Sequence, residues 1–145
     1  MRSFRIELVE SSFAKGGSLV TGEVWFSIDG VDFPSRNWND FAVTILGWWV
    51  EAAISLAAGE EATFGFMDGP WLVEAKPLPN QAAELVFIDD HSPSPTIVAT
   101  RSLPQVEIRN EIRRAAALVI SVCVSGGWHT QELDLLRERT AVLTP

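Results

Sequence analysis

Hydrophobic and polar residues alternate at the start of the chain with the period of a half-buried β-strand. This alternation is clear over residues 4–9 and again from Val20 to Ile28. Between these runs, the stretch Ser11 to Ser18 contains two consecutive glycines and predicts a turn. We therefore expect the first 28 residues to form a β-hairpin.

From Trp38 to Ala58 nearly every position is apolar or small, which predicts a long and largely buried helix. Asn37 is a residue type that caps helix N-termini, and Asp40 would place negative charge near the positive end of the helix dipole. Gly59 is typical of a helix C-terminus. The polar exceptions fall on one narrow stripe, which also carries Trp48. They are Thr44, Glu51 and Ser55.

Four short runs with strand character follow, separated by turn-forming residues. They cover residues 61–67, 71–76, 83–88 and 96–101. Ser102 and Gln105 then fit a capping box for a helix over residues 103–125. The end of that helix, Ala115 to Val124, is apolar on all sides, so we expect it to be enclosed within the domain or by a subunit contact. A short final helix is predicted from Thr130 to Arg139.

This order predicts a single globular domain over residues 1–145, of the α+β class. We expect a mainly antiparallel sheet of about six strands with two or three helices packed on it, in the order β-β-α-β-β-β-β-α-α. Strands that follow one another through short turns favour an antiparallel meander.

The composition is that of a globular protein, with 47% hydrophobic and 21% charged residues. The N-terminus has no pattern of a signal peptide, and no apolar run reaches the roughly 18 residues of a membrane span, so we expect a cytoplasmic protein. A single cysteine excludes an intrachain disulfide framework. No phosphate-binding loop or dinucleotide fingerprint is present, and we expect no cofactor.

The net charge of −8 lies in the middle of the chain. Residues 37–100 hold nine acids and one base, Lys76, whereas the two flanking segments nearly balance. Such a field repels nucleic acid and anionic membranes and attracts basic proteins. The alternative is that the charge serves solubility alone.

Two of the six tryptophans stand among polar neighbours. Trp25 lies on the polar side of its strand, and Trp48 lies on the polar helical stripe. Exposed aromatic residues near acids are typical of protein interfaces. The alternative is that a second layer of the same domain covers them.

Asp89, Asp90 and His91 form the best candidate for a metal site or a general acid–base site, since both chemistries use carboxylates beside an imidazole. The same residue types also make solvated turns. Cys123 has no basic neighbour in sequence to lower its pKa, so we interpret it as a buried structural thiol.

One stretch resembles a known group of proteins. It comprises Phe33-Pro34, Trp38-Asn39-Asp40-Phe41, Ile45-Leu46-Gly47-Trp48-Trp49 and Phe66-Met67-Asp68-Gly69-Pro70. It is similar to small uncharacterised bacterial proteins, some of which look like immunity proteins of polymorphic toxin systems. The similarity covers about a quarter of the chain, residues 33–70. It implies a cytosolic protein that neutralises a toxin by binding, and it implies no catalytic residues.

The sequence therefore favours a non-enzymatic protein-binding domain that engages a basic protein through an acidic face, with a toxin-neutralising immunity protein as its most specific form. The residues expected to contribute are Trp48, Glu51, Glu60, Glu61, Asp89 and Asp90. One alternative is a small-ligand or metal-dependent enzyme built around Asp89, Asp90 and His91. Another is a homo-oligomeric structural protein, such as a homodimer, that closes the apolar helix end and a sheet edge against a second copy.

Overall fold

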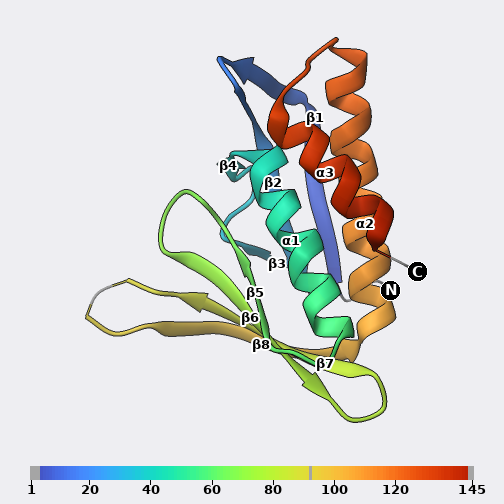
Figure 1. The fold of residues 1–145 in the computed structure, drawn as a ribbon. Helices are drawn as coiled ribbons and strands as arrows, with labels where there is room; N and C mark the ends of the chain where they lie inside the picture. Colours follow the sequence, from blue (N-terminus) through green and yellow to red (C-terminus); the bar gives the residue numbers. More distant parts are fainter. Residues whose placement is uncertain (1–3, 92, 144–145) are drawn as a thin grey trace.

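The computed structural model describes residues 4–91 and 93–143. Within these residues the chain is α+β, with three helices and two four-stranded antiparallel sheets (Figure 1). In chain order the elements are β1 (Phe4–Gly16), β2 (Leu19–Ile28), β3 (Val31–Phe33), β4 (Asn39–Asp40), α1 (Ala42–Ala57), β5 (Ala62–Gly65), β6 (Trp71–Leu78), β7 (Ala82–Asp89), β8 (Thr96–Pro104), α2 (Gln105–Ser125) and α3 (Gln131–Val142). The α+β class and the antiparallel pairing are confirmed, but the strands form two sheets of four in place of one sheet of six.

The first sheet is built on the predicted hairpin, in which β1 pairs with β2 from Phe4↔Ile28 to Gly16↔Leu19. The turn predicted from Ser11 to Ser18 is shorter than expected, because β1 continues to Gly16 and only Gly17 and Ser18 lie in the turn. An irregularity between Val9 and Ala14 shifts the register, and there the Ser12 hydroxyl accepts a hydrogen bond from the Glu23 N–H at 2.8 Å. Two short strands, β3 and β4, complete this sheet on β2.

The second sheet is the predicted meander, in the order β5-β6-β7-β8. In Figure 1 this sheet runs from green β5, which lies beside α1, to ochre β8, and the end where β7 and β8 are connected extends away from the helices. β7 pairs with β6 and β8 over its full length, and a register shift lies between Phe87 and Ile88.

The first helix begins later than the pattern predicts. Asn37 does not cap it but adopts a positive φ of 61°, and Asn39–Asp40 pair with β2 as β4. The predicted helical role of Asp40 is also wrong. Its buried carboxylate instead accepts hydrogen bonds from Trp38 Nε1 and from the N–H groups of Phe41 and Asp68. Three donors converging on one side chain hold this segment outside the helix.

The capping box at Ser102 and Gln105 is likewise wrong, because β8 extends through Pro104. The Gln105 side chain donates to the Ala82 carbonyl at 3.1 Å and so ties the start of α2 to β7. The third helix agrees with its prediction at its start, where the Thr130 hydroxyl accepts from the Leu133 N–H at 3.0 Å. None of the helices in the described residues is both long and apolar enough to span a membrane.

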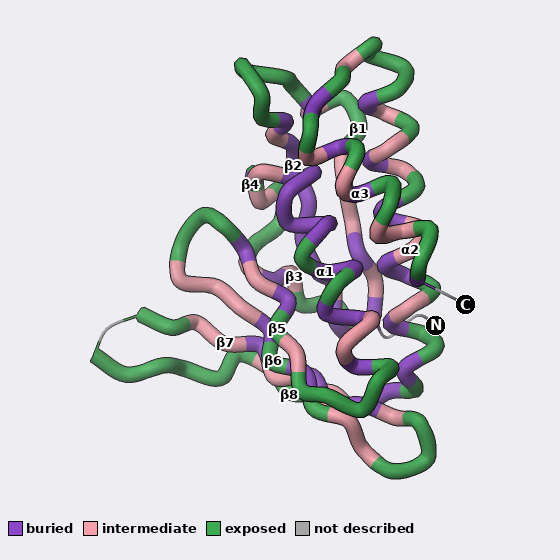
Figure 2. Tube along the Cα trace, viewed as in Figure 1, coloured by how far each residue is buried: buried purple, intermediate pink, exposed green. Residues whose placement is uncertain are grey.

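The apolar end of α2 is enclosed on one side. Ala115, Ala116, Val119 and Cys123 are buried, whereas Val124 on the opposite side is 53% exposed. The side of α2 that faces away from the core carries half-buried and exposed residues, coloured pink and green in Figure 2. The domain therefore does not surround this end of the helix. Closure by a second copy stays a prediction.

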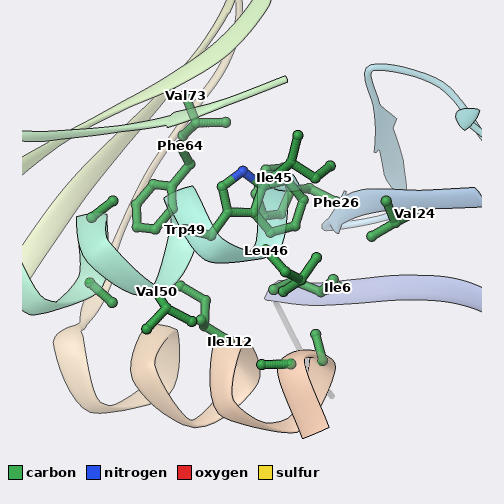
Figure 3. Close-up of a cluster of buried hydrophobic side chains, with 14 of the residues drawn as sticks. Ile6, Val24, Phe26, Ile45, Leu46, Trp49, Val50, Phe64, Val73 and Ile112 are labelled. Carbon is green, nitrogen blue, oxygen red and sulfur yellow. The ribbon is translucent and has the colours of Figure 1, made fainter. Parts of the chain in front are cut away.

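The core lies where α1 meets both sheets and α2 (Figure 3). Trp49 of α1 is fully buried at its centre and stacks on Phe26 of β2, with ring centroids 4.5 Å apart. In Figure 3, Phe64 of β5 lies beside Trp49, and Ile112 of α2 lies on the other side of α1, near Val50. α1 thus joins the two sheets, and it leaves the opposite face of the second sheet outside the core.

Candidate protein-binding face

The second sheet has one buried face and one open face. Alternation along its strands buries Phe64, Val73, Leu85 and Phe87 in the core, where Phe64 and Phe87 contact Phe26 of the first sheet. The side chains between them point the other way and are exposed or half-buried. We call this side the outer face, and it comprises Glu61, Thr63, Leu72, Glu74, Lys76, Glu84, Val86, Ile88, Ile97, Thr100 and Ser102.

A hollow of about 280 Å³ lies on this outer face. Three carboxylates line it, from Glu61, Glu74 and Glu84, together with the ammonium-bearing Lys76. Strand pairing brings these side chains together. Lys76 of β6 is opposite Glu84 of β7, and the next outward-facing pair along the same strands is Glu74 and Val86. Residues 60–104 hold seven acids and two bases, a net charge of −5, so the segment that forms the second sheet is negatively charged as a whole.

Trp48 reaches the outer face from α1. Trp49 beside it donates its ring N–H to the Gly65 carbonyl of β5 at 2.7 Å, which anchors α1 along the edge of the sheet. A Cβ placed on Gly65 would point to the outer face and would lie 3.7 Å from Trp48 Cε3. The indole of Trp48 therefore lies against the outer side of β5, 38% exposed.

Apolar side chains continue this surface across the sheet. Leu72 is opposite Ile88, and Ile88 is opposite Ile97 on β8. Leu72 and Ile88 are half-buried, whereas Ile97 is 64% exposed and its neighbour Val98 is 43% exposed. The outer face therefore combines an apolar part with an acidic part.

The other predicted acids lie elsewhere. Glu51 faces α3, where its carboxylate forms an ion pair with Arg139 at 2.7 Å. Glu60 is exposed in the turn after α1, next to Glu61 on the outer face. The structure therefore brings Trp48 and Glu61 to the outer face, leaves Glu60 exposed in the turn beside it, and directs Glu51 toward α3.

Asp89, Asp90 and His91 lie at the opposite end of β7 from Glu61. Asp89 is opposite Trp71 at the start of β6, about 15 Å along the sheet from the hollow. Its carboxylate pairs with the His91 ring and accepts from the His91 backbone N–H at 3.2 Å. Asp90 is exposed, and its backbone N–H donates to the Pro70 carbonyl at 2.8 Å. In residues 4–91 and 93–143, no three His, Cys, Asp or Glu side chains are grouped to hold a metal ion.

Trp25, which has polar neighbours in its strand, is buried by the fold and is not part of an exposed surface. It is 6% exposed and donates its ring N–H to the Asp32 carboxylate of β3 at 3.0 Å, so the same domain covers it. Glu74, Glu84 and Leu72 are members of the outer face that the sequence reasoning left out. The alternation of β6 and β7 identifies them as outward-facing, but the pairing register that gathers them is not visible in the sequence.

Comparisons of the chain with protein-family models, with curated proteins and with solved structures gave no match.

Proposed function

We propose that this chain is a non-enzymatic protein-binding domain that docks a basic protein on the outer face of its second sheet. The observation that carries the proposal is the composition of that face. An apolar strip lies beside three carboxylates on an open four-stranded sheet, and protein interfaces likewise combine an apolar contact area with polar and charged residues at its border.

The chemistry of the face selects the kind of partner. A net negative surface repels phosphate backbones and anionic lipid, so nucleic acids and membranes are poor ligands for it. A basic protein gains from the same field, because opposite charges speed its approach and orient it. The exposed apolar side chains then supply the area that is desolvated after contact.

The residues have distinct roles in this proposal. Trp48 is the aromatic anchor, since a partly exposed indole buries a large area on binding. Glu60, Glu61, Glu74 and Glu84 are the charges that steer the partner. Asp89 and Asp90 extend the negative field at the far end of β7, and Glu51 supports α1 through Arg139.

The more specific form of the proposal is toxin neutralisation. The resemblance of residues 33–70 to proteins that look like immunity proteins supports it, and the acidic face is complementary to a basic toxin such as a nuclease. In this more specific proposal, the partner is a toxin whose activity stops when this protein binds to it.

Affinity capture from the lysate of the source cell tests the proposal with three baits. They are the wild type, a face variant with Glu74→Lys and Glu84→Lys, and a control variant with Glu10→Lys and Glu138→Lys. Glu10 on β1 and Glu138 on α3 are exposed and lie off the second sheet, so both variants change the net charge equally. Mass spectrometry identifies the bound proteins.

A basic protein that is captured by the wild type and the control, and lost from the face variant, supports the proposal. Equal loss from both variants would show that only the total charge matters. Failure of the wild type to capture any basic protein would count against the function itself.

A further inference from the structure

The apolar side chains of the outer face form a straight row across the strands. Leu72, Ile88 and Ile97 are successive partners in the strand register of β6, β7 and β8. On β5, Gly65 is opposite Leu72, and the ring of Trp48 lies 3.7 Å from the position that a Cβ of Gly65 would take. The row thus crosses all four strands of the sheet.

The charged side chains lie on one flank of this row. One level along the strands, Thr63, Glu74 and Val86 are successive partners. At the next level, Lys76 is opposite Glu84, and Glu61, the residue that precedes β5, lies at the same end of the sheet. Successive levels on one face are about 7 Å apart, so Glu74 and Glu84 lie beside the row and not within it.

Two occupants fit this surface poorly. A second copy laid face to face about a two-fold axis would place Glu61, Glu74 and Glu84 of both chains in one interface, and each chain carries a net charge of −8. An added strand needs a regular edge, but β8 carries the register shift near Ile97, the charged Arg101 and the terminal Pro104. These features disfavour strand addition at β8 and leave the outer face available for a different partner.

We propose, building on the function above, that the partner covers this face with a basic amphipathic helix lying along the row. Three inter-strand spacings make the row about 14 Å long, which a helix of about ten residues covers. Apolar residues of the helix at positions i, i+3 or i+4 and i+7 contact Trp48, Leu72 and Ile88. Its Lys and Arg residues lie on the flank that faces Glu74 and Glu84.

Two synthetic peptides of identical composition test the helix directly. Both contain Leu, Ala, Lys and Arg; one arranges them with helical periodicity, and the other alternates apolar and basic residues as a strand does. Binding is measured by isothermal titration calorimetry or by fluorescence anisotropy of the labelled peptide. We expect saturable binding of the helical peptide and an affinity at least about tenfold weaker for the alternating one.

Matched variants locate the binding. Leu72→Thr with Ile97→Thr shortens the apolar row, and Glu74→Lys reverses one flanking charge; we expect each to weaken the helical peptide about tenfold. Val142→Thr and Glu138→Lys make similar changes on α3, where Val142 is 64% exposed, and we expect them to leave binding unchanged.

The inference is overturned if the alternating peptide binds as tightly as the helical one, or if the α3 variants weaken binding as much as the face variants. If neither peptide binds while a basic partner is captured through the outer face, the helix is wrong and the proposed function stands. If the capture fails as well, both are wrong.

Discussion

Glu111 of α2 accepts a hydrogen bond from the backbone N–H of Ile6 on β1, with 2.7 Å between the nitrogen and Oε2. Arg114, one turn later on α2, donates a hydrogen bond to the backbone carbonyl of Ile6 at 2.6 Å and another to the Glu111 carboxylate at 2.6 Å. An acid and a base of one helix thus satisfy both backbone groups of one residue on the edge strand of the first sheet. Arg5 adds a further positive charge 3.6 Å from the Glu111 carboxylate. At Ile6, these side chains therefore occupy the backbone groups that an added strand would need.

We expect Glu111→Ala to lower the free energy of unfolding by about 2–3 kcal/mol, because it leaves the buried Ile6 N–H without its acceptor. Glu111→Gln keeps an oxygen for that N–H, so a smaller loss is expected. Urea unfolding followed by circular dichroism measures both. Equal stability of Glu111→Ala and the wild type would show that the edge contact contributes nothing.

The same carboxylate predicts how stability depends on pH. Burial alone raises the pKa of Glu111, but hydrogen bonds from Arg114 and Ile6 and the charges of Arg114 and Arg5 outweigh burial and lower the pKa below its ordinary value of 4.5. The folded state therefore gains stability from Glu111 above about pH 4.5 and loses it as the pH falls through the lower folded-state value. Below pH 4.5 we expect a shallower loss of stability in Glu111→Gln than in the wild type. Parallel curves would contradict this.

Trp48 and Trp49 are adjacent in sequence but differ in role. We expect Trp49→Ala to destabilise the protein by about 3–5 kcal/mol, because it removes a fully buried ring and the hydrogen bond to Gly65. We expect Trp48→Ala to lower the unfolding free energy by clearly less, about 1–2 kcal/mol, because this residue is 38% exposed and lies at the surface of β5. Thermal and urea unfolding of the two variants compare them directly. A large loss of stability in Trp48→Ala would make this residue part of the core and not an anchor for a partner.

Cys123 lies on the buried side of α2 with no exposed surface, and burial raises the pKa of its thiol. A thiol that is both inaccessible and protonated reacts slowly with alkylating reagents. We expect iodoacetamide to leave Cys123 unmodified in the native protein at neutral pH and to label it fully in concentrated guanidinium chloride. Rapid labelling under native conditions would place this side of α2 at the surface.

Elements with a strong periodic pattern were predictable from the sequence, and their boundaries were not. The alternation along β6 and β7 and the apolar run of α1 are local signals, so they identify these elements correctly. The start of α1 depends on Asp40, whose carboxylate accepts a hydrogen bond from the backbone N–H of Asp68 in the loop before β6. No local pattern contains that contact.

The outer face shows the same division. The excess of acids in residues 37–100 is visible in the sequence, and so is the polar position of Trp48. The convergence of Glu61, Glu74 and Glu84 depends on the register of three strands, which single-sequence patterns do not specify. The same limit applies to Trp25, whose polar neighbours suggest exposure until β3 supplies Asp32.

The central claim is that carboxylates on the outer face steer a basic partner to the second sheet. The most direct measurement is the association rate constant of the captured partner, at low and high salt, with the wild type, with Glu61→Lys plus Glu84→Lys, and with Glu10→Lys plus Glu138→Lys. We predict that the outer-face variant associates more slowly and with a weaker salt dependence, and that the matched control stays much closer to the wild type. Equal slowing by the two variants, or an unchanged rate for the outer-face variant, would contradict the account.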